Sequence, residues 1–240
     1  MGIFVVTGAR RGIGQEYVRQ LSDSEENTVI ALVRSLSADL TALRDVESHA
    51  KGRVHILGCD ITSDESVPSL REEVASILKG DAEKIDVIIN NAAISNDQGV
   101  ASRDLSASVL LDHVNSNVCG PARVVQSLLP YLKENGIIAN ISSGLGSLGL
   151  LSEEKIPPHI PSYSISKAAL NMLTVHQAYE LRGKAIIVSI DPGHVKTDMG
   201  GEKAVLEIHD SAGQVLSTLA NLKSEDSGKF LEYNGSIVPW

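Results

Sequence analysis

The stretch TGARRGIG, residues 7–14, directly follows the short apolar run IFVVT at residues 3–7. Its glycines, Gly8, Gly12 and Gly14, allow a tight turn, a close approach of the backbone to a phosphate, and close packing of the next helix. A helix that begins at such a turn presents free N–H groups and the positive end of its dipole to an anion. A plain glycine turn is the alternative. The position between a first strand and a first helix favours a dinucleotide-binding α/β fold.

Apolar, β-branched runs alternate with amphipathic stretches along the rest of the chain. The expected strands are residues 3–7, 28–33, 53–58, 86–90, 136–142, 185–190 and, more weakly, 229–233. The expected helices are residues 12–21, 39–48, 64–78, 105–133, 162–182 and 210–222. Continuous apolar runs suit strands buried on both faces, and strand–helix alternation indicates a parallel sheet. We therefore predict a doubly wound (Rossmann) α/β fold of about seven parallel strands with helices on both faces, as a single domain over residues 1–240.

Composition and charge exclude several classes of protein. The 240 residues carry a formal net charge of −9 with scattered basic side chains, so a nucleic-acid partner is not expected. No apolar run approaches the roughly 18–20 residues of a membrane span, and no signal peptide is evident. Cys59 and Cys119 are expected to be buried thiols in a reducing, cytoplasmic environment, and the histidine spacings predict no metal site.

The second expected strand bears on the choice of cofactor. Folds that select NAD place an acid after this strand, where it binds the ribose 2′-hydroxyl. Here the strand ends in LVRSL, so Arg34 stands at that edge, and Arg10 and Arg11 lie in the glycine turn. An arginine can bind a 2′-phosphate that a carboxylate would repel. The pattern favours NADPH/NADP+ over NADH, although solvated surface charge is the alternative.

The glycine turn resembles the T-G-x-x-x-G-x-G fingerprint of the short-chain dehydrogenase/reductase family, and the resemblance covers essentially the whole chain. The segments VKTDMGG (195–201) and SGKFLEYNGSIVPW (227–240) look most like the sniffer-type carbonyl reductases and related fungal ketoreductases.

The resemblance implies a set of cofactor contacts. Asp60 would contact the adenine amino group with Ile61 beside the ring, and Pro192 and Gly193 would form a turn under the nicotinamide. The remaining implied contacts are Gly8, Ile13, Asn90 (with a structural role in the sheet as the alternative), Asn91, Ala92, Tyr163, Lys167, Val195 and Thr197. Ala93 replaces a glycine that the family usually has, which puts the local backbone conformation in doubt.

The motif YSISK, residues 163–167, places Tyr163 and Lys167 four positions apart, on one face of a helix. An exposed polar stripe is the ordinary interpretation. The resemblance implies instead a catalytic set of Asn117, Ser143, Tyr163 and Lys167. Free tyrosine has a pKa near ~10, and a cation one helical turn away would lower it.

The segment 144–162 contains Pro157, Pro158 and Pro161, so it is expected to be a loop that borders the substrate pocket. Ser143, Leu145, Tyr163 and His194 are the expected substrate contacts. His194 could act as an extra acid, but a pocket wall is its ordinary interpretation.

These patterns predict an NADPH-dependent reductase that converts a small-molecule ketone or aldehyde to an alcohol, with the proton from Tyr163. An NAD(P)-dependent alcohol dehydrogenase that runs in the oxidative direction, and a non-catalytic dinucleotide sensor, are the alternatives. The resemblance implies a homodimer or homotetramer formed through the helices at residues 105–133 and 162–182.

Overall fold

The computed structural model describes residues 2–78, 83–156 and 159–240. The described residues form one seven-stranded, all-parallel sheet with the strand order β3-β2-β1-β4-β5-β6-β7. The strands are β1 (Ile3–Thr7), β2 (Thr28–Val33), β3 (Arg53–Gly58), β4 (Ile85–Asn90), β5 (Leu132–Ile141), β6 (Ala185–Asp191) and β7 (Phe230–Glu232). The predicted doubly wound sheet is confirmed.

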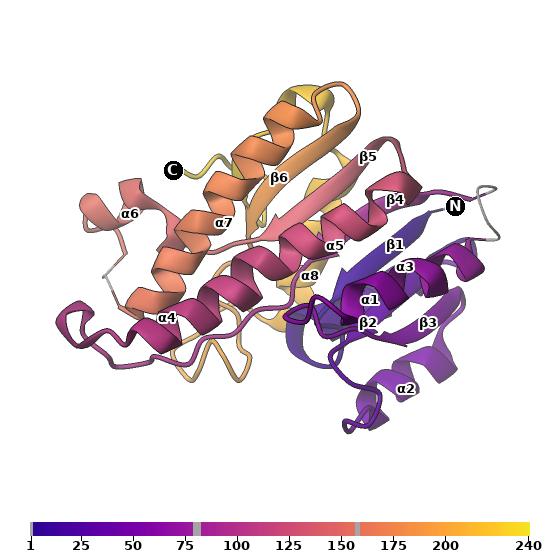
Figure 1. Cartoon of the computed structure of the whole chain (residues 1–240), viewed down its shortest axis with the longest axis horizontal. Coiled ribbons are helices and arrows are strands. Elements are labelled where there is room, and N and C mark those ends of the chain that lie inside the picture. The colour runs from indigo at the N-terminus through magenta and orange to yellow at the C-terminus, as the bar shows by residue number, and fades with distance from the viewer. Residues whose placement is uncertain (1, 79–82, 157–158) are drawn as a thin grey trace.

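Helices cover both faces of this sheet (Figure 1). The helices are α1 (Gly12–Leu21), α2 (Thr41–His49), α3 (Ser66–Ile77), α4 (Ala107–Val114), α5 (Gly120–Leu128), α6 (Leu148–Ser152), α7 (Pro161–Glu180) and α8 (Ile208–Ala220). Apolar side chains of α1, α2 and α8 pack on one face, and those of α3 and α5 pack on the other. In Figure 1, α4, α5 and α7 run in front of the sheet and α8 lies behind it.

The central strands form because their apolar residues are covered on both sides. All six residues of β2, TVIALV, are buried, so this strand has no polar face. Each fully buried aliphatic side chain contributes roughly 1.5–3 kcal/mol relative to its exposed state. Because all seven strands are parallel, their carboxyl ends lie at the same edge of the sheet.

The prediction of one continuous helix over residues 105–133 is wrong. The segment contains α4, a π-helical turn at Asn115–Cys119, and α5, and β5 begins at Leu132 rather than at residue 136. The N–H of Gly120 donates to the carbonyl of Asn115, which widens the turn. Single π-helical turns inside α-helices are frequent at functional sites.

The expected loop at residues 144–162 contains more structure than predicted. A 3₁₀ turn at Gly144–Gly146 leads into α6, whose first turn is capped where the Ser147 hydroxyl accepts the N–H of Leu150 at 3.0 Å. Pro161 occupies the first turn of α7, where a missing N–H costs nothing. Pro157 and Pro158 lie outside the described residues.

Cys59 is buried, but Cys119 is only half-buried, which corrects the expectation for that thiol. None of the described helices is both long and apolar enough to cross a bilayer. The described residues contain no cluster of three histidine, cysteine or acidic side chains suited to a metal ion.

Candidate active site

The glycine turn brings a helix start against the end of β1. Gly8 and Gly12 adopt φ values of +68° and +60°, and a Cβ atom added at Gly14 would lie 2.4 Å from the carbonyl oxygen of Gly8. No side chain caps α1, and its first turn has no acidic residue. The turn therefore offers an uncapped, positively polarised helix end that fits a phosphate.

The segment after β4 is hydrogen-bonded to the start of this turn. The Thr7 hydroxyl accepts the N–H groups of Asn91 and Ala92, both at 2.9 Å, and the Asn91 amide donates to the Thr7 carbonyl. Asn90 instead donates to Asn140 Oδ1 at 2.9 Å within the buried sheet, which is a structural contact. Ala93 is not among the described residues with positive φ, so the replacement of glycine leaves this backbone unstrained.

The three arginines of the predicted cofactor region face different partners. Arg11 is paired with Asp198 at 2.5 Å, and both side chains are mostly exposed. Arg10 lies within electrostatic range of Asp39, and Arg34 lies within electrostatic range of Asp60. The turn therefore directs Arg11 toward the loop after β6, whereas Arg34 stands at the exposed end of β2.

The two residues after β3 differ in exposure. Asp60 is half-buried, and its Oδ1 accepts the N–H and the hydroxyl of Thr62 at 3.0 and 2.7 Å. Ile61 is buried, and a Cβ atom added at Gly120 would lie 2.6 Å from Ile61 Cδ1. The Ile61 side chain thus packs against the start of α5.

The loop after β6 folds back over the glycine turn. Gly193 has a φ of +80°, and Val195 is buried in a bridge to Leu206. A Cβ atom added at Gly12 would lie 3.5 Å from Thr197 Cγ2, so Thr197 borders the glycine turn. Pro192 precedes this turn, and its carbonyl accepts the hydroxyl of Ser211 at 2.7 Å.

His194 is exposed, and its Nε2 lies 2.8 Å from the carbonyl oxygen of Gly200. This contact holds the ring within its own loop. Among the described contacts, none joins His194 to Ser143, Tyr163 or Lys167.

Lys167 is the most deeply buried charged residue of the candidate site, with 2% of its surface exposed. Its Nζ donates to the Ile141 carbonyl at 2.6 Å and lies 5.5 Å from the centre of the Tyr163 ring. Burial lowers the pKa of Lys167 to about 7, and the Asp191 carboxylate opposes this change. The ammonium is therefore inside the protein, which excludes an exposed polar stripe.

The Tyr163 hydroxyl is hydrogen-bonded to the Ser143 hydroxyl. The N–H of Leu145 donates to the same serine oxygen at 3.2 Å, which fixes the Ser143 side chain toward the tyrosine. Burial, together with the charge of Asp191, raises the pKa of Tyr163, and the bond to Ser143 opposes this. Leu145 itself is half-buried beside these groups.

Asn117 lies in the π-helical turn and is fully buried. Its Oδ1 accepts the N–H of Ile94, and its Nδ2 donates to the Ile94 carbonyl and to Ser166 Oγ. Ser166 donates in turn to the Tyr163 carbonyl at 2.7 Å. The Asn117 side chain thus connects the loop after β4 to the first turn of α7, the helix that carries Tyr163.

Sequence reasoning missed Asp191, the last residue of β6, although it lies next to the predicted Pro192–Gly193 turn. Its Oδ1 accepts the N–H of Gly193 at 3.0 Å. The signal was available, because residues at the carboxyl ends of parallel strands are the ones that face a ligand.

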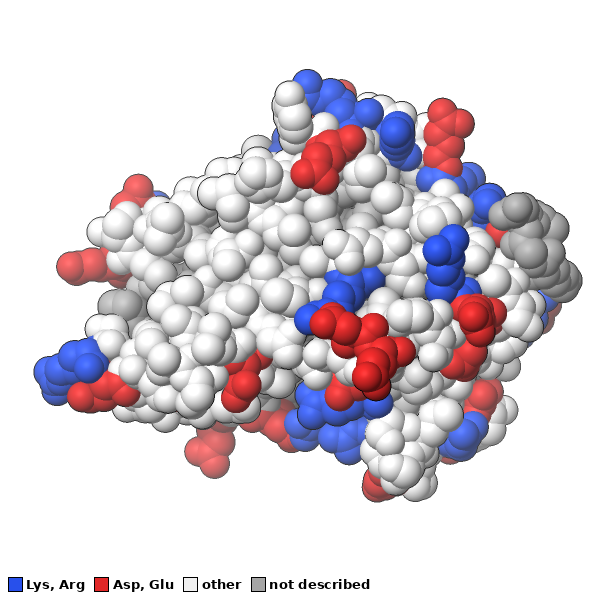
Figure 2. Space-filling view, in the orientation of Figure 1, with Lys and Arg blue, Asp and Glu red and all other residues white. Residues whose placement is uncertain are grey.

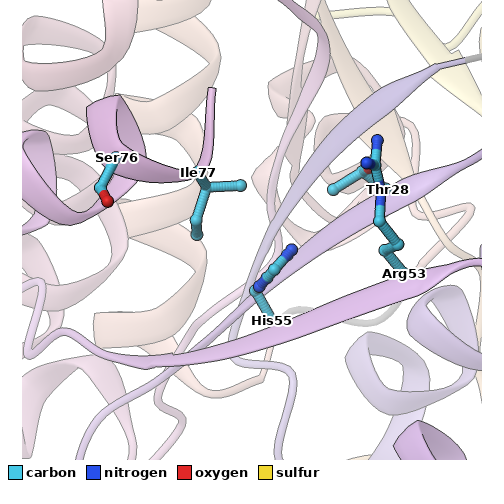
Figure 3. Close-up of a pocket in the computed structure, with 5 residues that line it drawn as sticks. All are labelled: Thr28, Arg53, His55, Ser76 and Ile77. Atoms are coloured by element: carbon cyan, nitrogen blue, oxygen red, sulfur yellow. The ribbon is translucent and has the colours of Figure 1, made fainter. Parts of the chain in front are cut away.

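A separate concavity lies at the opposite edge of the sheet, where β2 and β3 begin. Figure 3 shows its lining residues, Thr28, Arg53, His55, Ser76 and Ile77. Arg53 Nε donates to the Thr28 hydroxyl at 3.0 Å within it. Because it includes none of the strand ends described above, we do not assign it to the candidate active site.

Comparison with known proteins places these features in a family. The family model described as short chain dehydrogenase matches residues 2–205. An uncharacterized oxidoreductase of Schizosaccharomyces pombe is 32% identical, and the match covers 99% of this chain and 98% of that protein.

Two solved structures are similar along the whole chain. NADPH-bound carbonyl reductase from chicken fatty liver has a TM-score of 0.90 and 30% identity, with 100% of both chains covered. Carbonyl reductase Sniffer of D. melanogaster has a TM-score of 0.89 and 27% identity, with 100% of this chain and 99% of that chain covered.

Proposed function

Since the chain belongs to the short-chain dehydrogenase family, we propose that it is an NADPH-dependent carbonyl reductase in which Tyr163 protonates the carbonyl oxygen. The observation that supports this most directly is the grouping of half-buried Ser143 and Tyr163 with buried Lys167 at the carboxyl ends of β5 and β6. The NADPH-bound carbonyl reductase that shares the fold supports the same class of reaction.

The residues divide the chemistry between them. When bound, the cofactor supplies the hydride. The Ser143 hydroxyl, held by the N–H of Leu145, would donate a hydrogen bond to the substrate oxygen and polarise the carbonyl. Tyr163 would deliver the proton, and the charged form of Lys167 would stabilise the phenolate that remains.

Asn117 would act through position. Its three hydrogen bonds to Ile94 and Ser166 fix the first turn of α7, and with it the direction of Tyr163. A water in the proton relay, as the family resemblance implies, would lie beside this turn.

The same residues serve the reverse reaction, because a catalyst accelerates both directions. We favour reduction because the end of β2 carries Arg34 and no acid, which suits NADPH, the cofactor that cells usually keep poised for reduction.

Substitution of Tyr163 tests the proton donor. Tyr163→Phe removes only the hydroxyl, so we expect NADPH oxidation with a panel of ketones and aldehydes to fall roughly 100- to 10,000-fold. Tyr131→Phe is the matched control, since Tyr131 ends the turn at Leu129–Tyr131, before the amino end of β5 and away from the carboxyl ends of the strands. Equal rates for wild type and Tyr163→Phe in both reaction directions would contradict the proposed mechanism.

Substitution of the arginines tests the cofactor preference. We expect Arg34→Ala, alone or with Arg10→Ala, to raise the KM for NADPH roughly ten- to hundred-fold with little change for NADH, because one or two charge-assisted bonds to the 2′-phosphate are lost.

Arg11→Ala is the control within the same turn, because Arg11 is paired with Asp198 and should leave the ratio of the two KM values unchanged. A wild-type enzyme that uses NADH as well as NADPH would show that the arginines do not select the cofactor.

We also propose that the chain forms a homodimer or homotetramer. Figure 2 shows a broad surface with few charged side chains over α4, α5 and α7. Five large apolar side chains of α4 and α7 are exposed: Leu111, Ile165, Met172, Val175 and Tyr179. We propose that a second copy of the chain covers this face, because an apolar face with few charges can pack against the same face of another copy.

Sedimentation analysis checks the assembly. At micromolar concentration we expect a dimer or tetramer for the wild type and a shift toward monomer for Met172→Lys with Tyr179→Lys, since two ammonium groups would be desolvated in the interface. A monomeric wild type would rule out this face as a stable interface.

A further inference from the structure

Asp191 ends β6 at the centre of the candidate site. The register pairs Ile190 with Ile141 on β5 and Asp191 with Glu232 on β7. The Ile141 carbonyl accepts a hydrogen bond from the Lys167 ammonium. The residue that follows Ile190 therefore emerges beside the strand end that holds Lys167.

The Asp191 carboxylate connects two turns of the site. It accepts the N–H of Gly193 in the turn after β6 at 3.0 Å, and it accepts the N–H of Gly144, directly after Ser143. The approach is close, since a Cβ atom added at Gly144 would lie 3.0 Å from Asp191 Oδ2. The serine turn is thereby fixed against the turn that precedes the cofactor-binding loop.

Three ionisable groups face this carboxylate: Lys167 and Tyr163 from α7, and Glu232 from β7. Glu232 and burial raise the pKa of Asp191, burial being the larger cause, whereas the two backbone N–H groups and Lys167 lower it. Asp191 is the carboxylate that acts on the Lys167 ammonium, and an ammonium buried without a nearby negative charge would lose its proton.

We propose that Asp191 is a positioning residue of the active site, which fixes the Ser143 turn through Gly144 and serves as the counter-charge of the buried Lys167. This inference rests on the proposed reductase function, and it adds a fifth residue to the group of Asn117, Ser143, Tyr163 and Lys167.

The sign of the pH effect follows from the charge. Removal of the negative charge lowers the pKa of Lys167, because the ammonium loses an attractive neighbour. It also lowers the pKa of Tyr163, because the phenolate loses a repulsive one. Reduction requires a protonated Tyr163 and a charged Lys167, and both conditions are lost as pH rises. The alkaline limit of the reaction should therefore move to lower pH when Asp191 becomes neutral.

The test compares Asp191→Asn with Glu232→Gln, which removes the neighbouring carboxylate that faces neither Tyr163 nor Lys167. For Asp191→Asn we expect the alkaline limb of kcat to shift downward by about one pH unit, and for Glu232→Gln we expect no shift. If Asp191→Asn does not fold, Asp191→Ser replaces it, because a serine hydroxyl can still accept the N–H of Gly193.

A second readout needs no turnover. The alkaline titration of the Tyr163 phenolate, measured by ultraviolet difference absorbance against Tyr163→Phe, should shift downward in Asp191→Asn as well. An Asp191→Asn variant could have lower activity and a lower melting temperature, yet keep the wild-type midpoints of the kcat profile and of the Tyr163 titration. That result would show a purely structural residue and overturn the inference.

The two proposals fail in different ways. Wild-type activity in Tyr163→Phe would remove the proposed function itself. An inactive Tyr163→Phe would support the proposed function. If the midpoints of the kcat profile and of the Tyr163 titration were at the same time unchanged in Asp191→Asn, only the proposed role of Asp191 would be contradicted.

Discussion

The buried ammonium of Lys167 is the constraint on which the rest of the site depends. An ammonium with 2% of its surface exposed must have partners inside the protein, and its first partner is the Ile141 carbonyl at 2.6 Å. That carbonyl is available because Ile141 is the last residue of β5. The position of Lys167 thus follows from where a strand ends, and the site can exist only where α7 crosses that end.

The inner face of α7 is correspondingly polar. Thr174 and Gln177 accept the Asn140 amide, and Ser142 donates to Asn171, whose amide reaches the Gly146 carbonyl. The serine turn is therefore attached to the same helix that carries Tyr163 and Lys167. Hydrogen bonds of this kind hold a site in its working geometry before any ligand binds.

Much of the fold could be predicted from the sequence, because buried runs such as TVIALV and the glycines of residues 8–14 have one main structural interpretation. The π-helical turn at Asn115–Cys119 could not, since a single extra residue does not interrupt a helical pattern visibly. The motif YSISK showed which side chains share a face but not which face was inside. On α7 that face is polar and buried, while apolar Met172 is exposed, so hydrophobic periodicity gives the wrong orientation. The place of Asp191 at the end of β6 could be predicted from the sequence, but its contact with the Gly144 turn, which is distant in the sequence, could not.

The proposed mechanism requires the Lys167 charge to make the Tyr163 proton mobile, and the pKa of Tyr163 in the NADP+ complex tests this requirement most directly. The tyrosines can be labelled at ¹³Cζ and titrated by NMR, with the Tyr163 signal assigned from its absence in Tyr163→Phe. In the apoprotein, burial should hold this pKa above that of free tyrosine. In the NADP+ complex of the wild type it should fall, and in the complex of Lys167→Met it should stay higher by about one unit or more. Equal Tyr163 pKa values in the two complexes would contradict the account.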